Sequence, residues 1–328
     1  MRSARIEMAI EDGLFSLPES GWIAVYRPVA GDDLSALPKG RVVVLTGFRP
    51  DYEHFAAQGY RVEPTESYAA ALVCLPRARD LARALLAEAA RDVALGGPIA
   101  VDGQKTDGVD SMLKDLRGRL ALSDSLSKAH GKIAVFAAEG QLQEWTAQKS
   151  AIDGGFITQP GVFSADAPDR GSLMLAQALP AKLGPKVVDL GAGWGYLSRH
   201  ILEKEGVKRL DLVEAEALSL DCARENVKDE RASFHWADAL AFKPAALAET
   251  VVMNPPFHTG RSAEPALGAA FIAAARRMLA PDGVLWMVAN RHLPYDPVLE
   301  EHFLEVENVA GDNAFRVIRA AKPRRKNR

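Results

Sequence analysis

The sequence has few of the features that mark secreted, metal-binding or membrane proteins. Its 328 residues contain two cysteines, Cys74 and Cys222, too few for a disulfide framework and without the spacing of a zinc site. We therefore expect a reducing compartment, the cytoplasm, and no bound metal. Residues 1–5 are not followed by the apolar segment of a signal peptide, and no uncharged apolar run reaches membrane-spanning length. These absences predict a protein that does not interact with a membrane.

The chain also lacks an excess of charge of either sign. Its formal net charge is −3, so no overall basic field attracts it to nucleic acid. The phosphate-binding pattern GxxxxGK[ST] is absent as well. What is present is ordinary for a globular protein, with 48% hydrophobic and 25% charged residues, and the length favours two domains.

The first half alternates strand patterns with helix patterns. The clearest helix is at residues 77–94, where leucines recur at helical spacing. Such alternation predicts an α/β unit with a largely parallel sheet. The loop at residues 47–50 is too poor in glycine to cradle a cofactor, so we assign residues 1–145 a structural or substrate-gripping role. We expect residues 103–108 to form a polar loop. The other elements expected here are strands at residues 22–26, 41–46, 70–74, 99–101 and 133–137 and a short helix at 51–58.

A glycine-rich turn opens the second half. A strand pattern containing Asp189 runs into Gly191, Gly193 and Gly195, and a helical pattern begins at Tyr196. Glycines in such a turn permit positive φ angles and close approach of the backbone to a ligand. A strand, a glycine-rich turn and a helix N-terminus suit a nucleoside cofactor, although a tight structural turn has the same pattern.

Three further predicted strands also end in polar residues. Glu214 follows the second strand, and its carboxylate can accept hydrogen bonds from both hydroxyls of a ribose. Asp238 follows the third strand and can accept from an adenine amine. Asn254 ends the fourth strand. Because carboxyl ends of parallel strands meet at one edge of a sheet, these groups are expected to lie together.

The stretch that begins at Asn254 continues as Pro255, Pro256 and Phe257. The prolines end the strand, because they cannot donate backbone hydrogen bonds and restrict the residue before them to extended conformations. The Asn254 amide and the Pro255 carbonyl offer acceptors, and Phe257 offers a flat apolar face. Two acceptors beside an aromatic ring suit a planar group that bears an NH2. A strand-ending turn with a packed Phe is the simpler alternative.

Two nucleoside cofactors fit a ribose-binding acid. The nicotinamide fingerprint GxGxxG requires a third glycine at position 196, where Tyr196 stands. The pattern of glycines, acids and the Asn254 stretch instead resembles the class I methyltransferases that use S-adenosylmethionine (SAM). This resemblance implies SAM as the cofactor, with Glu214 at its ribose and Asp238 at its adenine. It implies cofactor-binding roles for Phe163, Asp189, Gly191, Gly193, Gly195, Glu214, Asp238 and Asn254.

Four stretches narrow the resemblance. Residues 160–164, 169–172, 254–258 and 288–295 look like those of the bacterial ribosomal RNA guanine-N2 methyltransferases, which act on small-subunit (16S) or large-subunit (23S) rRNA. Proteins of that family carry two methyltransferase-like domains, and the N-terminal one has lost its cofactor site. Two departures are Trp194 in the glycine loop, which we expect to pack on the cofactor or the rim of its site, and residues 166–168, where the family usually has a glycine.

The resemblance implies an α/β protein with two tandem Rossmann-like domains. Residues 1–145 are expected to form a degenerate methyltransferase-like domain, and residues 146–328 the catalytic domain. The catalytic sheet is expected to have seven strands and to end in an antiparallel hairpin around residues 311–313.

The function implied is methyl transfer from SAM to the exocyclic N2 amine of a guanine in ribosomal RNA, with 16S rRNA favoured. Asn254, Pro255 and Phe257 are the catalytic candidates, and Phe257, His258 and Arg291 the substrate-binding ones. The partner is ribosomal RNA or a ribosomal subunit, and we expect a monomer. Adenine N6 in DNA or RNA, a guanine of 23S rRNA and a protein glutamine remain alternative acceptors, because the Asn-Pro-Pro-aromatic motif serves planar amines generally. A catalytically silent RNA-binding or assembly protein is the alternative of another class.

Overall fold

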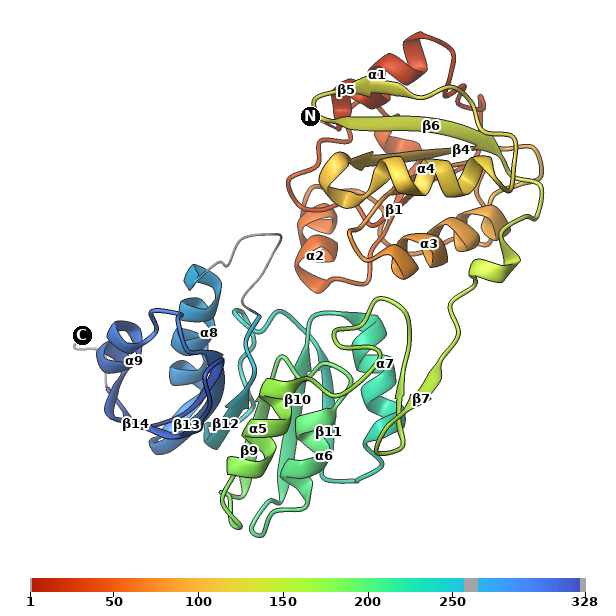
Figure 1. Ribbon diagram of the computed structural model, residues 1–328. Coiled ribbons are helices and arrows are strands. Elements are labelled where there is room, and N and C mark those ends of the chain that lie inside the picture. The colour runs from red at the N-terminus through yellow and green to blue at the C-terminus, as the bar shows by residue number, and fades with distance from the viewer. Residues whose placement is uncertain (1, 257–264, 325–328) are drawn as a thin grey trace. The chain divides into compact units, whose positions relative to one another are not determined.

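The computed structural model describes residues 2–256 and 265–324. The chain forms two compact units, Met1–Gln148 and Lys149–Arg328, each with its own sheet between layers of helices (Figure 1).

The first unit is built on a six-stranded sheet with the order β2-β1-β3-β4-β6-β5. Strands β2, β1, β3 and β4 are parallel, whereas β6 and β5 add an antiparallel hairpin. The strands are β1 (Ile23–Tyr26), β2 (Val42–Leu45), β3 (Ala70–Cys74), β4 (Pro98–Gln104), β5 (Leu126–Lys128) and β6 (Gly131–Ala137). The helices are α1 (Ser3–Glu11), α2 (Arg49–Ala57), α3 (Arg79–Asp92) and α4 (Val109–Arg117), with short 3-10 turns η1 (Lys39–Arg41), η2 (Lys105–Asp107) and η3 (Gln143–Trp145).

Both faces of this sheet are covered. The apolar side chains of α3 and α4 pack in one core, and those of α1 and α2 pack in the other. All residues of β1 and β3 are buried, which explains why their sequences are continuous apolar runs instead of alternating ones. The expected polar loop at 103–108 is wrong in part, because β4 continues to Gln104 to pair with β6 before η2 begins.

The second unit contains a seven-stranded sheet with the order β11-β10-β9-β12-β13-β15-β14. The first five of these strands are parallel, and β15 and β14 form the terminal antiparallel hairpin. The strands are β9 (Lys186–Leu190), β10 (Arg209–Glu214), β11 (Ala232–Trp236), β12 (Ala248–Met253), β13 (Leu279–Asn290), β14 (Phe303–Gly311) and β15 (Phe315–Pro323). A separate hairpin of β7 (Ser150–Ile152) and β8 (Phe156–Thr158) precedes them.

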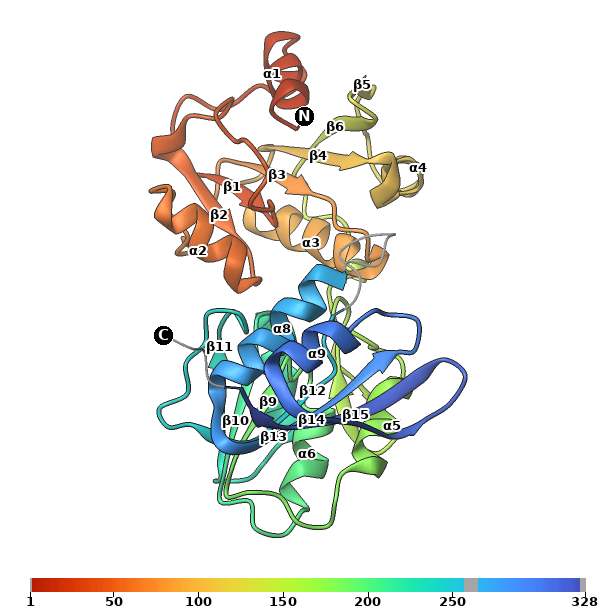
Figure 2. The ribbon, with the colours of Figure 1, turned by 90° about the vertical axis from the view of Figure 1, so that its left-hand side faces the viewer.

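Helices cover both faces of the second sheet (Figure 2). One layer contains α5 (Arg170–Ala178), α6 (Tyr196–Leu202) and α7 (Ala217–Asn226), and the other contains α8 (Pro265–Met278) and α9 (Asp296–His302). The predicted fold class, an α/β protein with two sheet-bearing domains and a seven-stranded second sheet, is confirmed. Strand β13 begins at Leu279, immediately after α8 ends at Met278.

The first sheet repeats the topology of the second without its outermost strand. The parallel strands β2, β1, β3 and β4 correspond to β10, β9, β12 and β13, and the antiparallel strands β6 and β5 correspond to β15 and β14. Strand β11 of the second sheet has no counterpart in the first sheet. In the first unit, ion pairs occupy the region of the sheet near the ends of β3 and β4. Arg2 contacts Asp32 at 2.9 Å and Asp102 at 2.6 Å, and the buried Arg5 contacts Asp102 at 2.5 Å.

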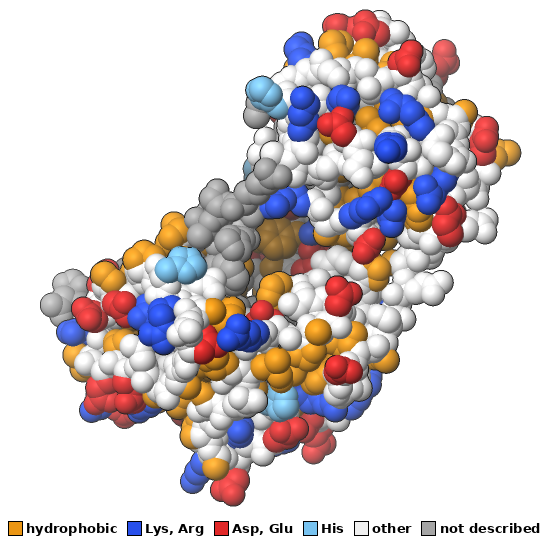
Figure 3. All heavy atoms as spheres, in the orientation of Figure 1, with side chains coloured by type: hydrophobic (Ala, Val, Ile, Leu, Met, Phe, Trp, Pro, Cys, Tyr) orange, Lys and Arg blue, Asp and Glu red, His pale blue; other side chains and the backbone are white. Residues whose placement is uncertain are grey.

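Charges are mixed on the molecular surface. On the face shown in Figure 3, Lys and Arg side chains lie among Asp and Glu side chains, as a net charge of −3 leads one to expect. Among the described helices, none is both long and apolar enough to cross a bilayer.

Candidate functional site

Four polar groups lie at the carboxyl ends of neighbouring parallel strands in the second unit. The strands β11, β10, β9 and β12 are adjacent in that order. Glu214 is the last residue of β10 and Asp189 the second to last of β9, whereas Asp238 and Asn254 follow the ends of β11 and β12. The prediction that successive strands bring these residues to one edge agrees with this order. Such an edge is the usual ligand-binding position in open α/β sheets.

The glycine loop after β9 is held in a conformation that L-residues rarely adopt. Gly191, Gly193 and Gly195 have φ angles of 79°, 56° and 89°. A Cβ added at Gly193 meets no atom within 4 Å, so this position faces open space, whereas a Cβ at Gly195 lies 3.0 Å from a methyl of Val227. Gly193 thus leaves room for a ligand, and Gly195 allows the N-terminus of α6 to pack closely on α7.

A hydrogen bond joins the loop to the neighbouring strand. The backbone N–H of Gly193 donates to Glu214 Oε2 at 2.8 Å, and the N–H of Glu216 donates to Oε1 at 2.7 Å. Burial raises the pKa of Glu214, and these backbone donors oppose the rise. Because each carboxylate oxygen has two lone pairs, Glu214 keeps acceptor capacity for a further donor.

Asp189 is the most deeply buried acid of the edge. Its Oδ2 accepts from the Ser198 hydroxyl at 2.6 Å, whereas its Oδ1 is buried without a hydrogen-bond partner. Burial and, to a smaller extent, the charge of Glu214 raise the pKa of Asp189 to about 7. A buried oxygen without a partner is costly, so a bound donor or cation would relieve it.

Asn254 is fixed through its nitrogen. Its Nδ2 donates to Asp169 Oδ2 and to Ser172 Oγ, both at 2.9 Å. Both amide protons are thereby engaged, and the oxygen is left to accept. Asp169 is also the N-cap of helix α5, and its carboxylate accepts from the Ser172 N–H at 2.9 Å. No local sequence pattern places Asp169 and Ser172 next to Asn254, because more than 80 residues separate them.

A small crevice brings these elements together. It is lined by residues of the glycine loop, by Asn254 with Asp169 and Ser172, and by Phe163, which is 58% exposed. Trp194 is buried against Phe156, and its indole N–H donates to the Phe163 carbonyl at 2.8 Å. The tryptophan therefore ties the segment around Phe163 to the glycine loop. Residues 166–168 are not among those lining the crevice.

The remaining predicted residues are distributed around this edge. Asp238 Oδ1 accepts from the Leu240 N–H at 2.8 Å, and Pro255 is buried next to Asn254. Arg291 is exposed just after β13, and its Nε donates to the Asp312 carbonyl at 2.8 Å. Phe257 and His258 lie outside the described residues.

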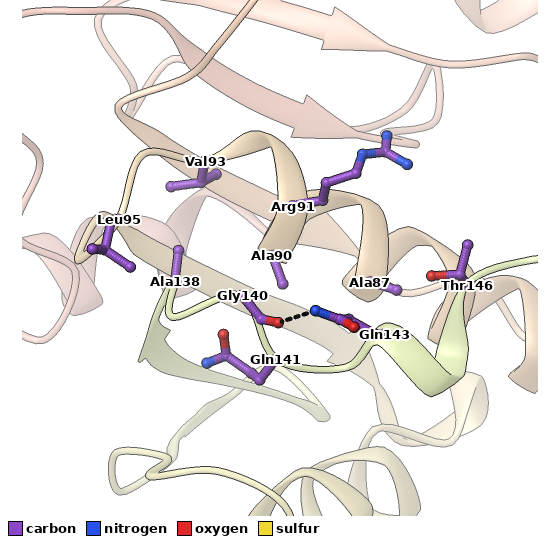
Figure 4. Close-up of a pocket in the computed structure, with 10 residues that line it drawn as sticks. All are labelled: Ala87, Ala90, Arg91, Val93, Leu95, Ala138, Gly140, Gln141, Gln143 and Thr146. Carbon is purple, nitrogen blue, oxygen red and sulfur yellow. Dashed lines mark hydrogen bonds between the residues drawn. The ribbon is translucent and has the colours of Figure 1, made fainter.

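A second cavity, in the first unit, does not have the chemistry of an active site. Its volume is about 430 Å³, and it lies between α3 and the segment after β6 (Figure 4). Its lining is mostly small or apolar, Arg91 is its one charged residue, and Gln143 donates to the Gly140 carbonyl within it at 3.2 Å. We therefore assign the chemistry to the smaller crevice, where one acid, an oriented amide and the glycine loop converge. In the described ranges no group of three or more His, Cys, Asp or Glu side chains is arranged to hold a metal ion.

The geometry fits a SAM-type cofactor. Asp189 Oδ1 lacks a partner, Gly193 faces open space and Glu214 retains acceptor capacity. A seven-stranded sheet of this order with a glycine loop and acids on successive strands defines the class I methyltransferase class of protein.

The comparisons with known proteins identify the family. Residues 153–319 match the family described as methyltransferase small domain. The ribosomal RNA small subunit methyltransferase C of Pseudomonas aeruginosa (strain LESB58) is 30% identical over 271 residues, covering 79% of this chain and 81% of that protein. The protein of the same name from Shewanella amazonensis is 28% identical over 290 residues, covering 81% and 84%. This chain therefore belongs to the methyltransferase small domain family, among the ribosomal RNA small subunit methyltransferase C proteins, and the predicted family and enzyme class are confirmed.

A solved structure extends the fold comparison to nearly the whole chain. The T. thermophilus 16S rRNA N2 G1207 methyltransferase (RsmC), solved in complex with AdoMet and guanosine, has a TM-score of 0.78 and 24% identity. The match covers 98% of this chain and 91% of that one, so both units share their fold with that protein.

Proposed function

We propose that this protein transfers a methyl group from SAM to the exocyclic N2 amine of a guanine in small-subunit ribosomal RNA. The observation that carries the proposal is the Asn254 amide, whose donors are taken by Asp169 and Ser172 beside the glycine loop. An oxygen fixed in this way accepts a hydrogen bond from an incoming amine. The relatives named for small-subunit rRNA, and the solved relative with AdoMet and guanosine, support the predicted cofactor, reaction and substrate class.

The cofactor is held by the acidic half of the sheet edge. Glu214 accepts hydrogen bonds from the ribose hydroxyls, and Asp238 accepts one from the adenine amine. Asp189 and the loop of Gly191, Gly193 and Gly195 face the methionine and ribose parts of the cofactor. Phe163, in the segment that precedes α5, covers one side of the crevice. When bound, SAM supplies a methyl group that is already electrophilic.

The reaction needs alignment more than acid–base chemistry. The N2 lone pair of guanine is delocalised into the ring. Hydrogen bonds from its protons to the Asn254 oxygen and the Pro255 carbonyl favour a more pyramidal and more nucleophilic nitrogen, and they hold it in line for attack. The amine loses its proton after attack, so no strong general base is required. Phe257 stacks on the base, and His258 and Arg291 contact the substrate.

The first unit serves the substrate or the structure and does not bind cofactor. Residues 1–145 form a degenerate copy of the methyltransferase domain, and residues 146–328 form the catalytic domain. The ion pairs of Arg2 with Asp32 and Asp102, and of Arg5 with Asp102, support a structural role for this unit, because they join the N-terminal segment to β4. The protein acts as a monomer in the cytoplasm, without a metal and away from membranes.

The test is modification mapping combined with a single substitution. Mass spectrometry of rRNA nucleosides from cells with and without the protein should show loss of one N2-methylguanosine in 16S rRNA. A methylated adenine, or a change confined to 23S rRNA, would contradict the proposal. Asn254→Ala should lower the single-turnover rate roughly 10²–10³-fold while SAM affinity stays within a few-fold, because its hydrogen bond strengthens as the nitrogen pyramidalises.

A further inference from the structure

Two exposed guanidinium groups lie at the end of the sheet edge that the cofactor residues leave free. Arg170 begins α5, immediately after Asp169, whose carboxylate holds Asn254. Arg291 follows β13, the strand next to β12. Arg170 therefore follows a residue that contacts Asn254, and Arg291 follows the strand next to the one that ends before Asn254.

The turn between β14 and β15 organises both side chains. Asp312 Oδ2 accepts from Arg170 Nη2 at 2.5 Å, and the Asp312 carbonyl accepts from Arg291 Nε at 2.8 Å. Asp312 is itself fixed, because its Oδ1 accepts from the backbone N–H groups of Ala314 and Phe315 at 2.7 and 2.8 Å. One turn thus presents two guanidinium groups toward solvent beside the site.

Both arginines keep unused donors. A guanidinium has five N–H groups, and the Arg170 side chain remains 66% exposed while it contacts Asp312. Such a group can bind an anion with two parallel hydrogen bonds, and a side chain already held in place loses less conformational entropy when it does so.

The two halves of the sheet edge differ in charge. The cofactor half carries only acids, Asp189, Glu214 and Asp238, whereas the other half carries Arg170 and Arg291 together with the carboxylates of Asp169 and Asp312. The whole chain has a net charge of −3, so its overall electrostatic field does not attract a polyanion such as RNA. Binding of the RNA backbone therefore requires cationic side chains near the site. An RNA base that enters the Asn254 corner is turned out of its stack, which brings its own backbone phosphates to the rim.

We propose that Arg170 and Arg291 form a phosphate clamp that binds the RNA backbone next to the target nucleotide. The inference rests on the proposed function, and it adds the residues that hold the substrate strand in register with Asn254. The methionine carboxylate of SAM is the other anion at this edge, and the experiment separates the two.

The experiment uses the full-length chain with Arg170→Gln and Arg291→Gln, singly and together, and small-subunit rRNA as substrate. Each single change should raise the KM for rRNA about three- to tenfold with kcat and the affinity for SAM unchanged, because a phosphate contact positions the RNA without entering the reaction. The slope of log kcat/KM against log salt should become shallower by roughly 0.7 for each arginine lost, the value for single strands. Arg170→Lys and Arg291→Lys should restore the slope because they keep the charge.

The matched control is Arg224→Gln. Arg224 is an exposed arginine of the same unit that also pairs with one acid, Asp221 at 2.8 Å, but it lies on α7. This variant should behave as wild type, and melting temperatures of all variants should agree, since the changed side chains are at the surface.

Two results of the kinetic experiment would overturn the clamp. One is a KM and salt slope for the double variant equal to those of Arg224→Gln. Another is a loss of SAM affinity in Arg170→Gln without a change in RNA binding, which would assign the arginine to the methionine carboxylate. Wild-type protein that methylates no rRNA would instead refute the proposed function. In that case, fluorescence anisotropy would measure the affinity for RNA directly and test the clamp independently of methyl transfer. A salt dependence of RNA affinity that is the same in the variants as in wild type would refute the clamp.

Discussion

Asn254 shows how one side chain is given a single hydrogen-bonding role by its neighbours. Asp169 and Ser172 accept from its nitrogen, so rotation of the amide would place its oxygen against a carboxylate. The same environment changes what a conservative substitution does. From the sequence alone, Asn254→Asp is expected to keep more activity than Asn254→Ala, because it retains an acceptor.

The structure reverses this expectation for Asn254→Asp. A carboxylate at 254 would stand about 3 Å from the Asp169 carboxylate, where the nitrogen now donates at 2.9 Å. Two acids so close raise the pKa of the pair and share one proton at low pH. We predict activity near that of Asn254→Ala at pH 8 and a partial recovery toward pH 6 in single-turnover assays. A pH profile parallel to that of Asn254→Ala would refute the repulsion.

Asp189 is an acid whose protonation favours the folded chain. Its pKa is raised from 3.8 to about 7 by burial and by the charge of Glu214. The unfolded chain therefore releases this proton at lower pH than the folded chain does. Stability contributed by Asp189 is fully present below about pH 4 and is lost as pH rises toward 7.

Asp189→Asn should remove that pH dependence. The difference in unfolding free energy between wild type and variant should change by up to about 1.4 kcal/mol per pH unit between pH 4 and 7, with wild type relatively less stable at the higher pH. An Asn at this position still accepts from Ser198, so the fold should persist. Chemical denaturation at a series of pH values measures the difference, and parallel curves for the two proteins would show that Asp189 is not protonated in the folded state.

At the scale of elements, the loop between β9 and α6 has two glycines with separate tasks. Gly193 turns open backbone to the crevice, and Gly195 starts α6 where the helix meets Val227 of the following segment. Positive φ is required at both, yet only Gly195 is also crowded.

Alanine substitutions should separate these tasks. Gly193→Ala should cost roughly 1–2 kcal/mol of stability from the left-handed backbone alone, and should weaken SAM binding at least tenfold because the methyl enters the ligand space. Gly195→Ala should lose roughly 1–3 kcal/mol more, through contact with Val227. Denaturation and calorimetry measure the two effects. If both variants lost stability equally and bound SAM equally, the assignment of Gly193 to the cofactor would be wrong.

At the scale of the whole molecule, two sheets of nearly the same topology differ in the charged groups that they carry. In the second unit the edge is open glycine backbone, acids and an oriented amide. In the first, Arg5 is buried against Asp102 and Arg2 joins Asp102 to Asp32. Removing one partner of such a buried pair is strongly destabilising, so these charges hold the first unit together instead of receiving a ligand.

The full-length protein should accordingly bind one SAM. Isothermal titration should give a stoichiometry near one per chain, and Gly193→Ala should remove that binding without revealing a second site. A segment of residues 1–145 prepared alone should show no SAM-dependent rise in melting temperature, since a ligand stabilises only a state that binds it. A second equivalent of SAM bound by the full chain would contradict the assignment of the first unit.

The sequence by itself predicted most of the strands and the acids that are proposed to hold the cofactor. Continuous apolar runs such as residues 70–74 and 250–253 predict buried strands, because in a covered sheet both faces of each strand must be apolar. Asp189, Glu214 and Asp238 were found from their positions after successive strands, since parallel topology carries strand ends to a common edge. Helices α1, α4, α7 and α9 were not predicted, because short helices with mixed or alanine-rich patterns give weak periodicity.

Only the tertiary structure decided the contacts made across long stretches of chain. Asp169 and Ser172 meet Asn254, Asp312 meets Arg170, and Arg2 and Arg5 meet Asp102, and each pair is brought together by packing of a helix or turn against a sheet. No local pattern encodes such pairs. An Asp before a helix has the same sequence signal whether it only caps the helix or also orients a distant amide. The strands and the acids therefore followed from periodicity and topology, whereas the orientation of Asn254 and the arginine clamp followed from packing, because packing alone determines which side chains share a hydrogen bond.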